Sequence, residues 1–133
     1  MRFEGCHTVV DSSISVPNCL ALDWVHGLLY WADSGLDKLE VLNVSDPSSR
    51  RTLVSSGLTH PTSVAVDPSE SLLFWADYFR LERMNQDGSG RRVLLRTSLY
   101  RLALDLQAKR LYWADRFNDR IESSDYDGAD RRL

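Results

Sequence analysis

One segment of this chain occurs three times, and its internal spacing constrains the fold more than any other feature. Each copy begins with an apolar residue and Asp, and ends with an aromatic residue followed by Trp-Ala-Asp. The copies occupy residues 22–33, 66–77 and 104–115, and in each of them ten positions separate the first aspartate from the last. Three identical spacings indicate an internal repeat, so we expect a repeat architecture.

The repeat extends beyond these segments. Each copy is followed by a basic-apolar-Glu triplet and then by two adjacent arginines. The triplets lie at residues 38–40, 80–82 and 120–122, and the arginine pairs at 50–51, 91–92 and 131–132. The period is 44 residues from Asp23 to Asp67 and 38 from Asp67 to Asp105. A period of this length accommodates four short strands with their turns.

Strand and turn signals alternate through the first unit, and no segment has helical periodicity. The strands are predicted at residues 20–25, 28–33, 38–44 and 50–56, with turns at 26–27, 34–35 and 45–48. A further strand is expected at residues 7–10, which resemble the last strand of this unit. Each unit is therefore predicted to be a four-stranded antiparallel meander. Period, strand count and lack of helices favour propeller blades over a solenoid.

We therefore predict an all-β chain of about three four-stranded antiparallel propeller blades. The whole chain, residues 1–133, forms one partial propeller with repeat units at approximately 11–54, 55–95 and 96–133.

The signature residues are expected to have structural roles, because each recurs in every unit. Successive side chains of a strand point to opposite faces, so the aromatic residue and the tryptophan require that both faces of the sheet be covered. The aspartate that follows needs partners, for which the arginine pairs or backbone N–H groups of a neighbouring blade are candidates. The signature residues are Tyr30, Trp31, Asp33, Phe74, Trp75, Asp77, Tyr112, Trp113 and Asp115.

Composition and motifs argue against several classes of function. The net charge is −3 and the 16 Lys and Arg residues are scattered, so no nucleic-acid surface is indicated. The sequence shows no signal peptide and no apolar run long enough to span a membrane. Enzyme motifs are missing, His7 and His60 lack a metal-spaced partner, and we predict no catalytic residue, metal or cofactor. Cys6 and Cys19 lack C-x-x-C spacing, and whether they pair stays open.

The chain resembles the class B repeats of the low-density lipoprotein receptor, known as YWTD repeats, over essentially its whole length. The signature appears as YWAD, FWAD and YWAD, with Ala where that family often has Thr. A preceding Pro-x-x-apolar-Ala-apolar-Asp pattern lies at 17–23 and 61–67. The Asp-Gly turns at 87–88 and 127–128 also match the family's pattern.

The resemblance implies a six-bladed propeller, of which three blades are present. Such propellers are usually followed by an EGF-like module and occur in endocytic lipoprotein receptors, in Wnt co-receptors and in the matrix protein nidogen. We therefore expect a non-catalytic segment on the extracellular side of a single-pass membrane receptor, at the cell surface and in endosomes. Its expected role is ligand binding or acid-dependent ligand release. A Wnt co-receptor ectodomain and a nidogen-like matrix protein are the alternatives.

The resemblance also implies partners. These are a protein or lipoprotein ligand, neighbouring blades, EGF-like or class A modules, and a folding chaperone of the endoplasmic reticulum. The ligand and the residues that bind it are not predicted. Three blades of six would leave two inter-blade faces exposed. We therefore expect the chain either to be a fragment, which is the favoured alternative, or to complete its ring with another copy.

The sequence departs from the family pattern in three places. Leu99 stands where the other units have Pro, the stretch before Asp105 is three residues shorter, and the turn after Asp77 is two residues shorter. We expect an abnormal connection between the second and third blades. Cys19 stands where the family commonly has Gly, which suggests strain at the start of that strand.

Three more residues carry expectations. Asn43 begins an Asn-Val-Ser glycosylation sequon at the end of a strand. His26 lies on a turn and is the candidate pH sensor, because the charge of a histidine changes between neutral and endosomal pH and the family's endocytic members use propeller histidines in acid release. Trp24 lies outside the repeated aromatic pair and is expected to pack in the core.

Overall fold

The computed structural model describes residues 5–133, which form eleven β-strands and no helix. Three antiparallel sheets follow one another along the chain, and each is a simple meander. Blade 1 contains β1 (Pro17–Asp23), β2 (Leu28–Asp33), β3 (Lys38–Asn43) and β4 (Asp46–Val54). Blade 2 contains β5 (Pro61–Asp67), β6 (Leu72–Asp77), β7 (Arg80–Asn85) and β8 (Arg92–Arg96). Blade 3 contains β9 (Arg101–Asp105), β10 (Arg110–Asp115) and β11 (Arg120–Asp125).

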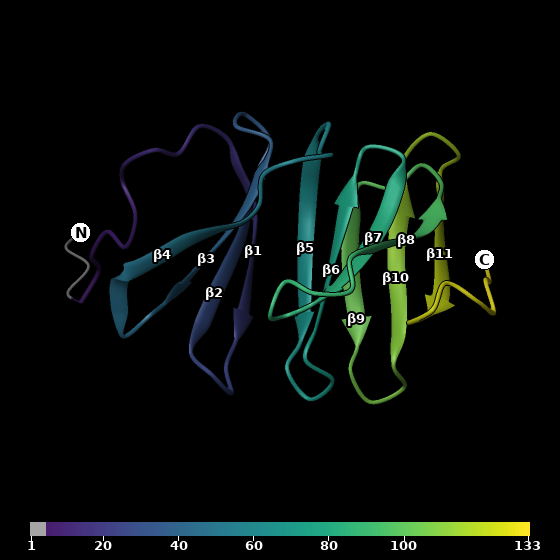
Figure 1. The fold of residues 1–133 in the computed structure, drawn as a ribbon. Coiled ribbons are helices and arrows are strands. Elements are labelled where there is room, and N and C mark those ends of the chain that lie inside the picture. Colours follow the sequence, from purple (N-terminus) through teal and green to yellow (C-terminus); the bar gives the residue numbers. More distant parts are fainter. Residues whose placement is uncertain (1–4) are drawn as a thin grey trace.

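The blades stand side by side, with the two ends of the chain at opposite ends of the row (Figure 1). The first strands of the blades, β1, β5 and β9, contact one another in that order. This is the arrangement predicted from the repeat: an all-β chain of propeller blades. No helix among the described residues is long and apolar enough to cross a membrane.

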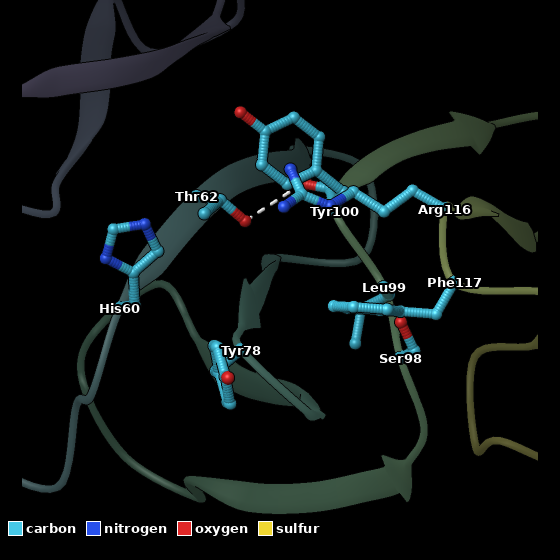
Figure 2. A pocket seen from close by; sticks show the side chains of 8 residues that line it. All are labelled: His60, Thr62, Tyr78, Ser98, Leu99, Tyr100, Arg116 and Phe117. Carbon is cyan, nitrogen blue, oxygen red and sulfur yellow. Dashed lines mark hydrogen bonds between the residues drawn. The ribbon is translucent and has the colours of Figure 1, made fainter.

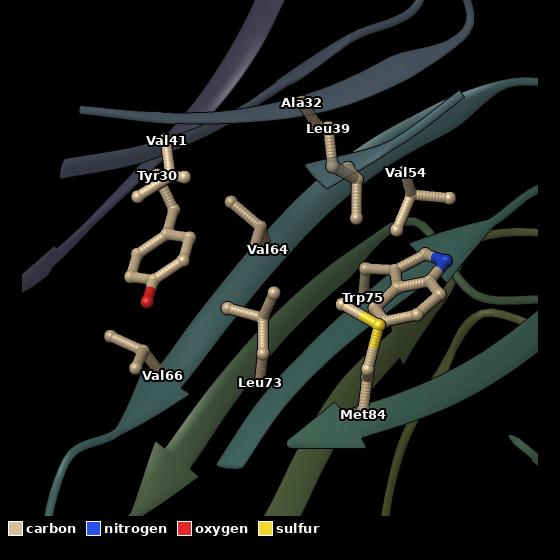
Figure 3. Close-up of a cluster of buried hydrophobic side chains, with 10 residues drawn as sticks. All are labelled: Tyr30, Ala32, Leu39, Val41, Val54, Val64, Val66, Leu73, Trp75 and Met84. Carbon is tan, nitrogen blue, oxygen red and sulfur yellow. The ribbon is translucent and has the colours of Figure 1, made fainter. Parts of the chain in front are cut away.

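Two apolar clusters hold the blades together. The first lies between blades 1 and 2, where Tyr30 and Leu39 pack with Val64, Leu73 and Trp75 (Figure 3). The second lies between blades 2 and 3 and contains the opposite face of blade 2. Blade 2 is therefore buried on both faces, and Phe74 and Trp75 are both 0% exposed. Burial of such aromatic pairs supplies much of the hydrophobic stabilisation.

Blade 3 has three strands, whereas four are predicted. Residues 126–130 form the same turn after β11 that residues 86–90 form after β7, and the chain then pairs with β11 only through an isolated bridge between Ser123 and Arg132.

Two predicted details of blade 1 and of the segment that precedes it are wrong. Residues 7–10 are not in a strand. An outer strand pairs with the third strand of its own blade, and no such strand lies beside them among the described residues. The predicted turn at 45–48 is instead the two-residue connection Val44-Ser45, because Asn43 pairs with Asp46 and β4 begins there.

The expected disturbances are absorbed locally. The backbone φ of Cys19 is not positive. The strand β1 contains a bulge between Pro17 and Cys19, and β5 contains the same bulge between Pro61 and Ser63. The strain expected at Cys19 is therefore absent.

The shortened linker before blade 3 leaves β9 at five residues against seven in β1 and β5. The shortened turn after β6 becomes a two-residue hairpin, Tyr78-Phe79, with Tyr78 at φ +57°. Blade 3 still packs on blade 2, so the connection is shorter but not disrupted.

Candidate functional site

The last aspartate of each signature fastens the segment that enters its blade. Asp33 accepts hydrogen bonds from the backbone N–H groups of Ser15 and Val16 at 2.9 and 3.0 Å. Asp77 accepts the same bonds from Thr59 and His60, and Arg80 also donates to it. Both carboxylates are 0% exposed, so these donors compensate for their burial.

In blade 3 this pattern is local. Asp115 accepts bonds from the backbone of Phe117 and from the side chain of Asn118, at 3.1 and 2.7 Å. The hydrogen bond from Asn118, stronger here than the opposing effect of burial, lowers the pKa of Asp115. Backbone N–H groups bond the aspartate in all three blades, but they belong to the segment that enters the blade or to the turn that follows the aspartate. The donors expected from a neighbouring blade or from the arginine pairs are not found among the described residues.

The arginine pairs serve another purpose. The first arginine of each pair binds the glutamate of its own blade and stacks over the signature tryptophan. The pairs are Arg50 with Glu40 and Trp31, Arg91 with Glu82 and Trp75, and Arg131 with Glu122 and Trp113. The Nε to Oε1 distances are 2.9, 3.0 and 2.7 Å. The repeated glutamate was the sequence signal for this contact, because a buried carboxylate at one position in every unit requires a fixed cation.

The first aspartate of blades 1 and 2 joins that blade to the next. Asp23 accepts a hydrogen bond from Gln86 at 2.9 Å, and Asp67 accepts one from Tyr126 at 2.7 Å. Gln86 and Tyr126 occupy the same place, directly after the third strand of a blade. Lys109 also donates to Asp67 at 2.8 Å. Burial alone would raise the pKa of Asp67, but the hydrogen bonds from Lys109, Ser69 and Tyr126 lower it to about 2.

These repeated contacts build the scaffold, and the candidate site lies at one end of it. A cavity of about 190 Å³ opens where β5 begins and where β6 and β10 end (Figure 2). Its lining residues are His60, Thr62, Tyr78, Ser98, Leu99, Tyr100, Arg116 and Phe117.

The cavity combines exposed aromatic surface with positive charge. Tyr78 is 51% exposed and Phe117 64% exposed. The Arg116 guanidinium carbon lies 4.9 Å from the Tyr100 ring centre and 5.6 Å from that of Phe117. Arg101 stacks on Tyr100 at 5.0 Å. Such a surface suits a segment with an apolar side chain beside a carboxylate.

The Thr62 hydroxyl donates a hydrogen bond to the Tyr100 carbonyl at 2.9 Å. This bond joins blade 2 to the segment that enters blade 3, at the lining of the cavity. The sequence did not single out this site. Its signal is the aromatic residue within two positions after the signature aspartate in blades 2 and 3, at Tyr78 and Phe117, where blade 1 has Ser34 and Gly35.

The structure does not bring the predicted site residues to this cavity. His26 lies on the β1–β2 turn, at the opposite end of the strands, with Nδ1 2.7 Å from the Asp23 carboxylate. Asn43 ends β3, is partly exposed, and accepts a bond from the Ser45 N–H at 2.9 Å. Trp24 is 61% exposed on the β1–β2 turn, so its expected place in the core is wrong. Trp24 is exposed because, among the described residues, no neighbouring blade covers the tip of this turn.

The two cysteines are unpaired in the described residues. No cluster of three or more potential metal ligands occurs within residues 5–133.

Comparison with known proteins agrees with this architecture. A family model described as low-density lipoprotein receptor repeat class B matches residues 27–68. Residues 27–68 are therefore similar to a class B repeat of the low-density lipoprotein receptor. The chain is 34% identical over 134 residues to the human low-density lipoprotein receptor-related protein 5-like protein, covering 97% of this chain and 53% of that protein. It is 49% identical over 113 residues to low-density lipoprotein receptor-related protein 8 of Gallus gallus, covering 80% of this chain and 12% of that protein.

Solved structures share the fold of these repeats. A chain in the crystal structure of a nidogen–laminin complex aligns with a TM-score of 0.88 and 28% identity, over 94% of this chain and 50% of that one. Hydrazine synthase of Kuenenia stuttgartiensis aligns at 12% identity with a TM-score of 0.67, which is a likeness of fold alone. The chain spans about half the length of the first relative and a smaller part of the second.

Proposed function

We propose that these repeats are a non-catalytic extracellular segment of a lipoprotein-receptor-like endocytic receptor, and that the cavity beside Arg116 binds its protein ligand. The observation that carries the proposal is the stacking of Arg116 between the Tyr100 and Phe117 rings at the mouth of this cavity. Two aromatic faces and a guanidinium favour a peptide segment with an apolar residue next to Asp or Glu. The receptor relatives support the extracellular placement.

A phage-displayed library of random peptides tests the site without knowledge of the natural ligand. Peptides selected on the wild-type chain should be rich in acidic and apolar residues. The variant Arg116→Glu should weaken their binding about tenfold or more, a loss of about 1.4 kcal/mol. Arg51→Glu is the matched control, because Arg51 is an exposed arginine in β4, away from the cavity. Equal binding to both variants would remove the proposal.

Acid-dependent release is the finer part of the proposal, and His26 is its candidate sensor. His26 is 54% exposed and contacts Asp23 Oδ2, the atom that also accepts the bond from Gln86 of blade 2. Asp87 lines the same hollow as His26. Protonation of His26 would place a cation beside this carboxylate and change a contact between blades 1 and 2.

A His26→Ala variant of the full receptor tests this part. Its ligand should dissociate less at about pH 5.5 than from the wild type, while binding at neutral pH is unchanged. Unaltered acid release would rule out His26.

The cell-surface and endosomal location, the neighbouring EGF-like or class A modules and the folding chaperone belong to the same proposal. A nidogen-like matrix protein is the alternative that a specific observation favours, namely the likeness to the nidogen–laminin complex. Surface biotinylation of cells that express the full-length protein separates the two. Labelled protein in the cell fraction supports a receptor, and protein only in the medium supports a matrix role.

A further inference from the structure

The outer face of blade 3 exposes residues that are buried in the other blades. Tyr112 is 39% exposed, whereas its counterpart in blade 1, Tyr30, is 2% exposed. Ile121 is 67% exposed, whereas Leu39 and Leu81 at the same repeat position are at most 1% exposed. A hollow of about 250 Å³ lies over this face and is lined by Tyr112 and Ile121. Blade 3 therefore presents the surface with which blades 1 and 2 pack against their next blade.

The opposite end of the row exposes the matching half. Leu20 and Leu22 of β1 are 65% and 50% exposed. Their counterparts in blade 2, Val64 and Val66, are 3% and 7% exposed because blade 1 packs on them. The described part of the segment that enters β1 leaves Leu20 and Leu22 exposed. Arg50 binds the Ser12 carbonyl in the same way that Arg91 binds Ser56 at the joint already formed.

The exposed face of blade 3 and the exposed face of blade 1 therefore match each other. Equivalent faces already pack together twice within the chain, between blades 1 and 2 and between blades 2 and 3. We propose that two copies of this chain associate head to tail, with blade 3 of each copy packed on blade 1 of the other, and close a ring. The chain aligns with 50% of a solved propeller-containing chain at a TM-score of 0.88, so two copies match its length. Closure by two such contacts satisfies both open faces of both copies.

The joint between two copies lacks a hydrogen bond that both joints within the chain contain. Asp105 is the counterpart of Asp23 and Asp67, which are bonded by Gln86 and Tyr126 of the next blade. In a second copy the residue directly after β3 is Val44, whose side chain donates no hydrogen bond. The joint between copies is therefore mainly apolar and weaker than the internal ones, and association should depend on concentration.

Light scattering coupled to size exclusion on residues 1–133 tests the proposal. We expect a species of twice the 15.2 kDa chain mass that dissociates on dilution. Ile121→Glu on blade 3 and Leu20→Glu on blade 1 should each weaken association by tenfold or more. Both positions are exposed, and circular dichroism checks that the variants fold. Val93→Glu is the control, because Val93 is an exposed apolar residue of β8, in the middle blade.

A mixing experiment fixes the geometry. An equimolar mixture of the Ile121→Glu and Leu20→Glu variants should recover a heterodimer, because one of its two joints contains no substitution. A wild-type chain that is monomeric at all concentrations would overturn the proposal. So would a dimer insensitive to Leu20→Glu, which would indicate blade 3 packing on blade 3. Open chains larger than a dimer would overturn ring closure.

Discussion

In each blade a single arginine joins three parts of the structure. Arg91 donates to the Glu82 carboxylate at 3.0 Å and to the Ser56 carbonyl at 2.7 Å, and its guanidinium carbon lies 5.5 Å from the Trp75 ring centre. Glu82 is only 2% exposed, so the loss of this cation would leave a buried charge without its main partner.

We predict that Arg91→Ala lowers the free energy of unfolding by about 3 kcal/mol, because it breaks this buried pair. Arg92→Ala is the control from the same arginine pair. Arg92 is an exposed residue paired with exposed Asp127, and its loss should cost about 0.5 kcal/mol or less. Urea denaturation measures both. Similar losses in the two variants would contradict the assigned role of Arg91.

The acid stability of the chain should depend on Asp67. This carboxyl group titrates at about 2 in the folded protein and near 3.8 in an unfolded chain. Its contribution is therefore complete above about pH 4 and is lost as the pH falls toward 2, where the unfolded chain takes up the proton first.

We predict that the stability difference between wild type and Asp67→Asn shrinks by about 2 kcal/mol between about pH 5 and pH 2. Urea denaturation at the two pH values measures this difference. Asp11→Asn, at an exposed position before β1, should show no comparable convergence. A constant difference for Asp67→Asn would mean that its carboxylate does not gain this stabilisation in the folded chain.

Among the elements, the β3–β4 hairpin presents Asn43 for modification. Asn43 ends β3, its side-chain oxygen is bonded to the Ser45 N–H, and the connection between the strands has only two residues. We predict a glycan at Asn43 when the chain is secreted from animal cells, which mass spectrometry before and after enzymatic deglycosylation would detect. Ser45→Ala removes the sequon without removing Asn43 and serves as the control. An unmodified Asn43 would refute the prediction.

The sequence predicted the elements that repeat and missed those that depend on neighbours. The recurring segment located β2, β6 and β10, because strand alternation and turn residues act locally. Whether residues 7–10 form a strand depends on whether a partner strand lies beside them. The repeat pattern gives no information about such a partner. The exposure of Trp24 depends in the same way on what covers the β1–β2 turn.

The candidate site was hidden for a related reason. The repeat draws attention to residues that recur, and the cavity is lined by residues that differ between blades. Phe117 and Tyr78 follow different signature aspartates, in turns of different length. They line one cavity because blades 2 and 3 pack together. The sequence also did not predict the partner of each first aspartate. Gln86 and Tyr126 occupy the same position in their blades but are different residue types, so no repeated residue marks the contact.

At the scale of the whole molecule, the middle blade should bear more of the stability than the outer ones. Phe74 is 0% exposed between blades 2 and 3, while Tyr112, its counterpart in blade 3, is 39% exposed. We predict that Phe74→Ala costs about 3–5 kcal/mol and that Tyr112→Ala costs less than half as much. Both are compared by urea denaturation at concentrations where the chain is monomeric. Equal losses would mean that the outer face of blade 3 is covered in solution.

The hydrogen bonds from the backbone of Thr59 and His60 to Asp77 have a consequence for chimeric propellers. A blade exchanged at the edges of its sheet would leave this carboxylate without its donors, or the donors without their carboxylate. The unit that can be transplanted is the sheet together with the linker that enters it, residues 55–96 for blade 2. Crossover points for grafting such blades therefore belong directly after the fourth strand, ahead of the linker.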